Sequence, residues 1–222
     1  MMTMWSLVFL LLALRAPVAI TVDTGLSSHL QPISYDLTIK IPDPTVSDGF
    51  TASLIMHFQL AIKSSNITLH AKDLHSLSRV SVISANGHFE PVLMSIHLYA
   101  ETVELIFLRP LPTGQYLLTI GEYSGHFTNG STGVIQRNQK LFTTHLQPNF
   151  TRQLLPCIDH PSVKAAFRVT VIHKVGTQAQ SNTIATDVSV VNSTWQKTIF
   201  APTPPLPAYL VTFSVMPPSY QE

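Results

Sequence analysis

Apolar and polar positions alternate along two long stretches near the start of the chain. In the first stretch, the positions on one face are Ile33, Tyr35, Leu37, Ile39 and Ile41. In the second, one face carries Phe50, Ala52, Leu54, Met56, Phe58, Leu60 and Ile62. Because successive side chains of a strand point to opposite faces, this period of two predicts two strands, each with one buried face.

Shorter apolar runs, separated by turn signals, continue the pattern to the end of the chain. They predict further strands at residues 80–84, 103–108, 116–120, 166–173 and 208–215. The turn signals are Pro42-Asp43-Pro44, Asn86-Gly87, the run 110–114 and Asn129-Gly130, and the stretch 121–125 also has the composition of a turn. Asn86-Gly87 lies between two β runs and predicts a hairpin. Beyond the N-terminal region no stretch has a sustained helical period, so we expect one all-β domain, an antiparallel sandwich or barrel-like sheet.

The charge of the chain is low and scattered. Charged residues make up 11% of the 222 residues, and the net charge is +1, against about 25% charged residues in an average soluble domain. No two lysines or arginines are adjacent. A nucleic acid or an anionic membrane surface needs a basic patch for recognition, so we expect neither as a partner.

The N-terminal region has the features of a secretory signal peptide. An apolar run at residues 5–14 is followed by Arg15 and the small residues Ala16 and Ala19. About ten apolar residues are too few to span a bilayer of roughly 30 Å as a helix, so we expect no stable membrane span. The pattern predicts a signal peptide at residues 1–22, give or take a few residues, and a β domain at residues 23–222. The alternative is an uncleaved signal anchor that tethers the protein to a membrane, and the early Arg15 argues against it.

Four N-glycosylation sequons agree with a secretory route. They begin at Asn66, Asn129, Asn149 and Asn192. One such triplet would mean little, but four together with a signal peptide favour a secreted, extracellular glycoprotein. Cys157 is the only cysteine, so no disulfide can form within the chain, and we expect it to be a buried free thiol.

A segment in the second half of the chain resembles the aminopeptidase N family of zinc metallopeptidases. The residues that fall on the family's motif are Gln147, Arg152, Pro156, Cys157, Asp159, Pro161, Lys164, Ala165 and Phe167. Four other stretches are similar to family motifs in the same order: residues 33–37, 69–74, 111–116 and 200–210. The resemblance is to the family's N-terminal β domain, which implies an antiparallel β-sandwich of saddle-like shape.

The resemblance also implies a role for one edge of this domain. In complete family members the residue at the position of Gln147 helps to bind the free N-terminus of the substrate, and a glutamine would accept a hydrogen bond from the ammonium group. The position two residues earlier is His145, where the family often has glutamine, and His160 replaces the usual glutamate of the motif. A glycan on Asn149 would crowd this same edge. We therefore expect the edge not to serve peptide hydrolysis here.

The family's catalytic motifs do not occur in the 222 residues. Hydrolysis in the family needs a zinc ion held by His-Glu-x-x-His and a Gly-x-Met-Glu-Asn stretch that aligns the substrate. No histidine here is followed by glutamate. We thus expect no catalytic residue, no metal and no cofactor in this chain, and zinc only together with a separate catalytic domain.

Two other groups of residues are candidates for a metal site and for a serine nucleophile. His70 and His75 flank Asp73, but this spacing in a strand-to-loop segment does not place both rings on one side, so core or surface roles are expected instead of metal binding. The stretch 121–125 has one residue too many before its serine for a Gly-x-Ser-x-Gly nucleophile elbow.

Three functional hypotheses follow. The first is a secreted, non-catalytic β domain that acts as a binding or regulatory module, with a full-length aminopeptidase relative or a peptide as its partner. The second is a truncated isoform or fragment of an active zinc-dependent aminopeptidase that removes N-terminal residues from peptides, with an apolar patch near Met216, Pro217, Pro218 and Tyr220 left for association. The third is a purely structural secreted glycoprotein.

Overall fold

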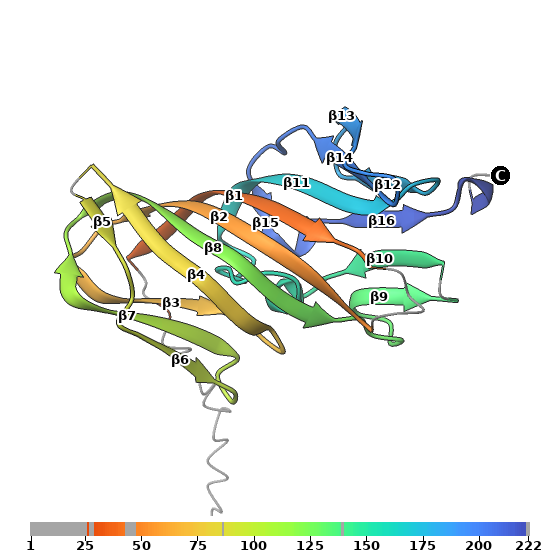
Figure 1. Ribbon diagram of the computed structural model, residues 1–222. Coiled ribbons are helices and arrows are strands. Elements are labelled where there is room, and N and C mark those ends of the chain that lie inside the picture. Colours follow the sequence, from red (N-terminus) through yellow and green to blue (C-terminus); the bar gives the residue numbers. More distant parts are fainter. Residues whose placement is uncertain (1–25, 27–28, 43–47, 86, 139, 221–222) are drawn as a thin grey trace, which may run out of the picture.

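The computed structural model describes residues 26, 29–42, 48–85, 87–138 and 140–220 (Figure 1). The predicted signal peptide and the residues Asp43 and Pro44 of one turn signal lie outside the described residues. The strands are β1 (Leu30–Lys40), β2 (Gly49–Leu60), β3 (Ser64–His70), β4 (His75–Ser84), β5 (Gly87–Phe89), β6 (Leu93–His97), β7 (Thr102–Leu111), β8 (Gly114–His126), β9 (Gly133–Arg137), β10 (Leu141–His145), β11 (Lys164–Lys174), β12 (Gln178–Ser181), β13 (Ala185–Val190), β14 (Trp195–Phe200), β15 (Leu206–Pro207) and β16 (Phe213–Met216).

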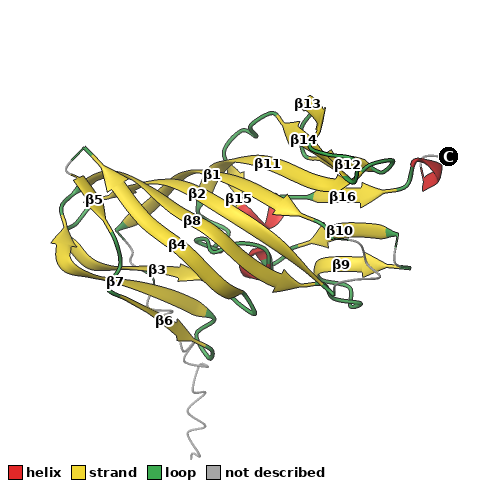
Figure 2. Ribbon diagram, in the orientation of Figure 1, coloured by secondary structure: helices red, strands yellow, loops and turns green. Residues whose placement is uncertain are grey.

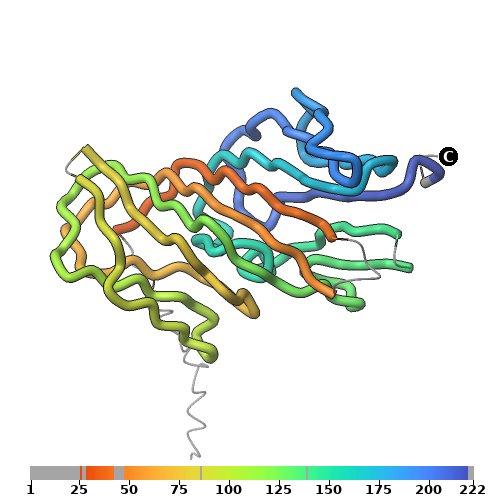
Figure 3. Tube along the Cα trace, viewed as in Figure 1, coloured from red at the N-terminus to blue at the C-terminus, as the bar shows by residue number. Residues whose placement is uncertain are grey.

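Three sheets make up an all-β sandwich, which confirms the predicted fold class. The large sheet has the order β13-β14-β11-β1-β2-β8-β4-β5, and β15 pairs with β11. A four-stranded sheet, β12-β16-β10-β9, lies toward one end of it, and a three-stranded sheet, β3-β7-β6, toward the other (Figures 1 and 3). Among the strand pairs of the described residues, β1 with β11 is parallel and the rest are antiparallel.

The helical content of the described residues is limited to three short 3-10 turns (Figure 2). These are η1 (Thr151–Gln153), η2 (Ala208–Leu210) and η3 (Pro218–Tyr220). None of the helices in this part of the chain is long and apolar enough to cross a bilayer.

The alternation in the first two strands places their apolar faces in the core, with one exception in each. Tyr35, Leu37 and Ile39 of β1 and Ile41 just after it are buried, whereas Ile33 is 47% exposed. The β1–β2 register shifts between Pro32 and Ser34, and such a bulge turns the residue off the core face. In β2, Ile62 is 60% exposed because the strand ends at Leu60.

Two further local predictions were wrong. Of the strand expected at residues 208–215, the first part is η2, where Val211 N–H donates to Ala208 O, and β16 begins at Phe213. Pro207 precedes the turn with φ −60° and has no N–H to donate to a ladder. The stretch 121–125, expected as a turn, continues β8, because β2 and β4 pair with it on either side.

The predicted hairpin at residues 86–87 is confirmed, but its turn lies one residue earlier in the chain than predicted. β4 and β5 are antiparallel with Ser84 opposite Gly87, so the loop consists of residues 85 and 86. Gly87 has a φ of +130°, a region that favours glycine. Asn86 itself lies outside the described residues.

Candidate functional site

The segment that carries the family motif runs between β10 and β11 and is buried in its middle part. Residues 154–159 are all buried, and residue 157 exchanges two backbone hydrogen bonds with residue 70 at the end of β3, at 2.8 and 3.0 Å. Lys72 N–H donates to Arg152 O at 2.9 Å. Because buried backbone polar groups need partners, these bonds explain how an irregular segment can lie inside the sandwich.

Three charged side chains of this region are paired with one another, and we call them the Arg152 clamp: Arg152, Asp159 and Glu101. The Arg152 guanidinium donates from Nε to Asp159 Oδ2 at 3.1 Å and from Nη1 to Glu101 Oε2 at 2.9 Å. The side chains of Arg152 and Asp159 are only 10% and 2% exposed. Lys72 Nζ also pairs with Glu101, so each acidic group of the clamp faces a cation.

The clamp lowers the pKa of one of its members, Glu101. Burial of the Glu101 carboxyl raises its pKa, but the hydrogen bonds from Lys72 and Arg152 outweigh burial, so the net effect lowers the pKa. Glu101 also has a left-handed backbone, with φ 52°, in a turn between β6 and β7. A non-glycine residue in this conformation persists only where its surroundings hold it there.

His70 is a structural acceptor next to the clamp. It is 2% exposed, and its Nδ1 accepts a hydrogen bond from Asp159 N–H at 3.0 Å, which leaves the proton on Nε2. Burial first, and then the nearby Arg152 charge, lower the pKa of His70 to about 4. His75, by contrast, is exposed, so the two histidines lie in different environments.

The remaining motif residues divide into buried and exposed groups. Pro156 and Cys157 are buried, and Cys157 is a free thiol, as expected from the sequence. Burial, followed by the Asp159 charge, raises the pKa of this thiol well above its usual value, so it stays protonated. Pro161 and Lys164 are exposed at the entry to β11.

The residues predicted to face a substrate N-terminus lie on the surface. His145 is the exposed last residue of β10, and its Nδ1 lies 2.7 Å from Ser131 O, to which it donates. Gln147 is exposed and begins a cis Gln147–Pro148 bond. Asn149, two residues on, is exposed as well.

The four sequons differ in their surroundings. Asn129, Asn149 and Asn192 are exposed. Asn66 is half-buried in β3, where its amide donates to Glu104 on β7. A glycan on Asn66 would be attached to the same half-buried nitrogen that donates this bond, so the exposed three are better placed to carry one.

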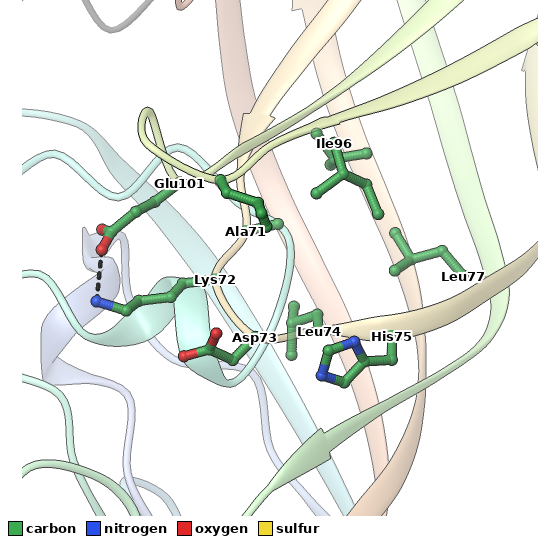
Figure 4. Close-up of a pocket in the computed structure, with 10 residues that line it drawn as sticks. Ala71, Lys72, Asp73, Leu74, His75, Leu77, Ile96 and Glu101 are labelled. Carbon is green, nitrogen blue, oxygen red and sulfur yellow. Dashed lines mark hydrogen bonds and ion pairs between the residues drawn. The ribbon is translucent and has the colours of Figure 1, made fainter.

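A pocket of about 330 Å³ opens beside the clamp, between the β3–β4 loop and the β6–β7 turn (Figure 4). Its apolar part is formed by Ala71, Leu74, Leu77, Ile96, Leu98 and Val103. The Lys72–Glu101 ion pair lies on one side of the view, and the Asp73 carboxylate is directed away from the His75 ring. Sequence reasoning missed this pocket, because residues 71–77 and 96–103 meet only through the pairing of β3 with β7.

The comparisons with known proteins agree with this fold and motif. Residues 31–210 match the Peptidase M1 N-terminal domain family. The chain is 28% identical over 220 residues to aminopeptidase N of Haemonchus contortus, covering 89% of this chain and 22% of that protein. It is 30% identical over 151 residues to a probable M1 family aminopeptidase 1 of Encephalitozoon cuniculi, with coverage of 66% and 17%, and 26% identical over 216 residues to aminopeptidase Ey of Gallus gallus, with coverage of 89% and 22%.

The chain spans about a fifth of the length of these relatives. The match covers the sandwich from β1 to η2, including the clamp, the Gln147 edge and the pocket. By its sequence and its all-β fold, the chain belongs to the M1 aminopeptidase family through that family's N-terminal domain.

Proposed function

We propose that this chain is a secreted, non-catalytic aminopeptidase-type β domain that binds a full-length aminopeptidase relative. One observation carries the proposal: the buried Arg152 and Asp159 of the family motif are paired inside the domain, whereas Gln147 faces solvent. Arg152 and Asp159 hold each other and Glu101 in the buried clamp. Gln147 and His145 are left at the surface, where they can contact a partner.

The surface character supports a protein partner. The net charge is +1, so a nucleic acid is not the ligand we propose. Gln147 has no hydrogen-bond partner among the described residues, and its carbonyl oxygen can accept from an ammonium or amide group of a docked chain. In this proposal the domain needs no cofactor of its own, and zinc belongs to the partner's catalytic domain.

Secretion through a cleaved signal is part of the same proposal, with an uncleaved membrane anchor as its alternative. The exposed sequons at Asn129, Asn149 and Asn192 support passage through the secretory pathway. A glycan on Asn149 lies two residues from Gln147 and would limit which partners reach this edge.

The second candidate is a β domain that works within an active zinc-dependent aminopeptidase, where Gln147 would contact the substrate's N-terminus. The names of the relatives, which are aminopeptidases, favour it. An immunoblot of the native tissue after glycan removal separates the two candidates. A band at or slightly below the chain's 24.5 kDa supports the stand-alone module, and a band several times larger supports the second candidate.

Binding of the purified chain to an immobilised M1 aminopeptidase, measured by biolayer interferometry, tests the first candidate. We expect saturable binding that weakens at least fivefold in Gln147→Ala. The matched control is Gln115→Ala, another exposed glutamine at the start of β8, which should bind as the unchanged chain does. Absence of binding up to high micromolar concentration, with no change in the aminopeptidase rate, would overturn the proposal.

A further inference from the structure

Two histidines from different strands meet on the surface at one end of the large sheet. His75 opens β4 opposite Ser124 of β8, and His126 ends β8 two positions further along. Residues at this diagonal spacing share a face of the sheet. The two rings lie in edge contact, with centroids 5.3 Å apart and planes inclined by 67°. We call them the histidine pair.

Both rings are accessible. His75 and His126 are exposed, and the His126 side chain is 58% exposed. Neither imidazole is held by a short hydrogen bond to a protein group in the described residues, unlike His145 or His173. The nearest acidic atom to His126 Nδ1 is Asp48 Oδ1, at 3.9 Å, beyond hydrogen-bonding distance. The ring nitrogens are therefore open to another ligand.

The spacing of the rings suits a shared metal ion. Zinc binds imidazole nitrogen at about 2.0–2.1 Å, and two imidazoles at a tetrahedral angle then have ring centroids about 5 Å apart. The observed centroid distance is 5.3 Å, and rotation about the side-chain bonds of the two exposed residues would turn one nitrogen of each ring toward a shared ion.

Two carboxylates lie around the histidine pair and can complete the site. Asp48 precedes β2, which neighbours β8, and its side chain is 93% exposed and free to swing toward the rings. Asp73 lines one hollow together with His126 and another together with His75. The backbone of Asp73 is left-handed, with φ 54°, in the loop between β3 and β4.

We propose that His75 and His126 bind a divalent transition metal ion, zinc in particular, with Asp48 and Asp73 as oxygen ligands. Within the described residues no group of three or more ligands is already assembled. The two imidazoles therefore form the fixed part of the site, and the carboxylates close on the ion when it binds. Imidazole nitrogen with carboxylate oxygen is a ligand set that suits zinc and copper over calcium or magnesium.

The site would join three neighbouring strands at one end of the sheet. His75 comes from β4, His126 from β8 and Asp48 from the residue before β2. From the sequence, no metal is expected at His70, Asp73 and His75. His126 gives no local signal there, because it lies 51 positions after His75 and reaches it only through the β4–β8 register.

Titration calorimetry of the untagged full chain with zinc chloride tests the proposal. We expect one ion bound per chain at micromolar affinity, and at least a tenfold loss of affinity in either His75→Ala or His126→Ala. Asp48→Asn should weaken binding by a smaller factor. The matched control is His88→Ala, which removes an exposed histidine of β5 and should leave the affinity unchanged.

Electron paramagnetic resonance with one equivalent of copper(II) gives an independent readout of the ligands. We expect the hyperfine pattern of two imidazole nitrogens in the unchanged chain and in His88→Ala, and of one in either single variant of the histidine pair. Circular dichroism checks that each variant is folded. Equal zinc affinity in all variants, or no binding below about 100 μM, would overturn the proposal, since another of the ten histidines would then hold the ion or none would.

Discussion

The Arg152 clamp and the histidine pair both consist of polar side chains in contact with one another, but the clamp is buried and the histidine pair is exposed. In the clamp, Arg152 and Asp159 are almost fully enclosed. The guanidinium nitrogens Nε, Nη1 and Nη2 each donate a hydrogen bond to a protein oxygen. In the histidine pair, two polar rings touch each other in solvent and are open to a ligand. Polar groups satisfied inside the domain stabilise the fold, and polar groups left open at its surface are available for binding.

The largest effect is expected from breaking the clamp on one side. Asp159→Ala leaves the Arg152 charge buried without its buried carboxylate partner, and removal of one partner of a buried pair costs about 3–5 kcal/mol. Urea unfolding followed by circular dichroism measures the change. Glu122→Ala is the control: it breaks an Arg79–Glu122 pair whose side chains are 69% and 58% exposed, and such exposed pairs contribute about 0–1 kcal/mol. Similar losses in both variants would contradict the role given to the clamp.

A smaller effect is expected from the histidine beside the clamp as pH falls. The pKa of His70 is lowered from 6.5 to about 4 in the folded chain, so the unfolded chain binds this proton more readily. Stability from neutral His70 is present in full above about pH 6.5 and is lost as pH falls toward 4. The lowered pKa of Glu101 acts in the same direction but only below its usual value of 4.5.

His70→Asn separates these contributions, because an asparagine carbonyl can still accept from Asp159 N–H. We expect the free energy of unfolding to fall less steeply between pH 6.5 and 4 in this variant. The slope should decrease by the equivalent of up to one proton taken up on unfolding. Some slope remains, since burial also lowers the pKa of His173. Unchanged slope, measured by urea unfolding at each pH, would mean that His70 is already protonated in the folded chain.

The sequence predicted the clamp's segment but not its geometry. Arg152 and Asp159 stand out through the family motif, whereas Glu101 has no signal of its own. It reaches Arg152 because β3 pairs with β7 and brings the turn after β6 to the motif. The histidine pair was hidden for the same reason: His75 and His126 meet through a pairing between distant strands. A strand's faces can be predicted from local alternation, but its neighbours depend on the whole sheet.

Local errors in the predicted fold also have physical causes. Ile33 continues the alternation of its strand, yet a bulge places its side chain away from the core. The alternation of apolar and polar positions does not reveal an extra residue in one strand of a pair. Residues 208–210 are apolar like a strand, but Pro207 begins a 3-10 turn there.

The smallest effect on stability is expected at the open surface, where Gln147→Ala should change the free energy of unfolding by less than about 0.5 kcal/mol. The Gln147 side chain is exposed and has no partner in the described part of the chain, so its loss removes no internal contact. Urea unfolding beside the Gln115→Ala control measures the change. A loss above about 1 kcal/mol would show that Gln147 supports the buried segment below it, and its effect on partner binding would then reflect damage to the fold. A neutral result, together with weaker binding to an aminopeptidase, would assign Gln147 to recognition and leave folding to Arg152 and Asp159.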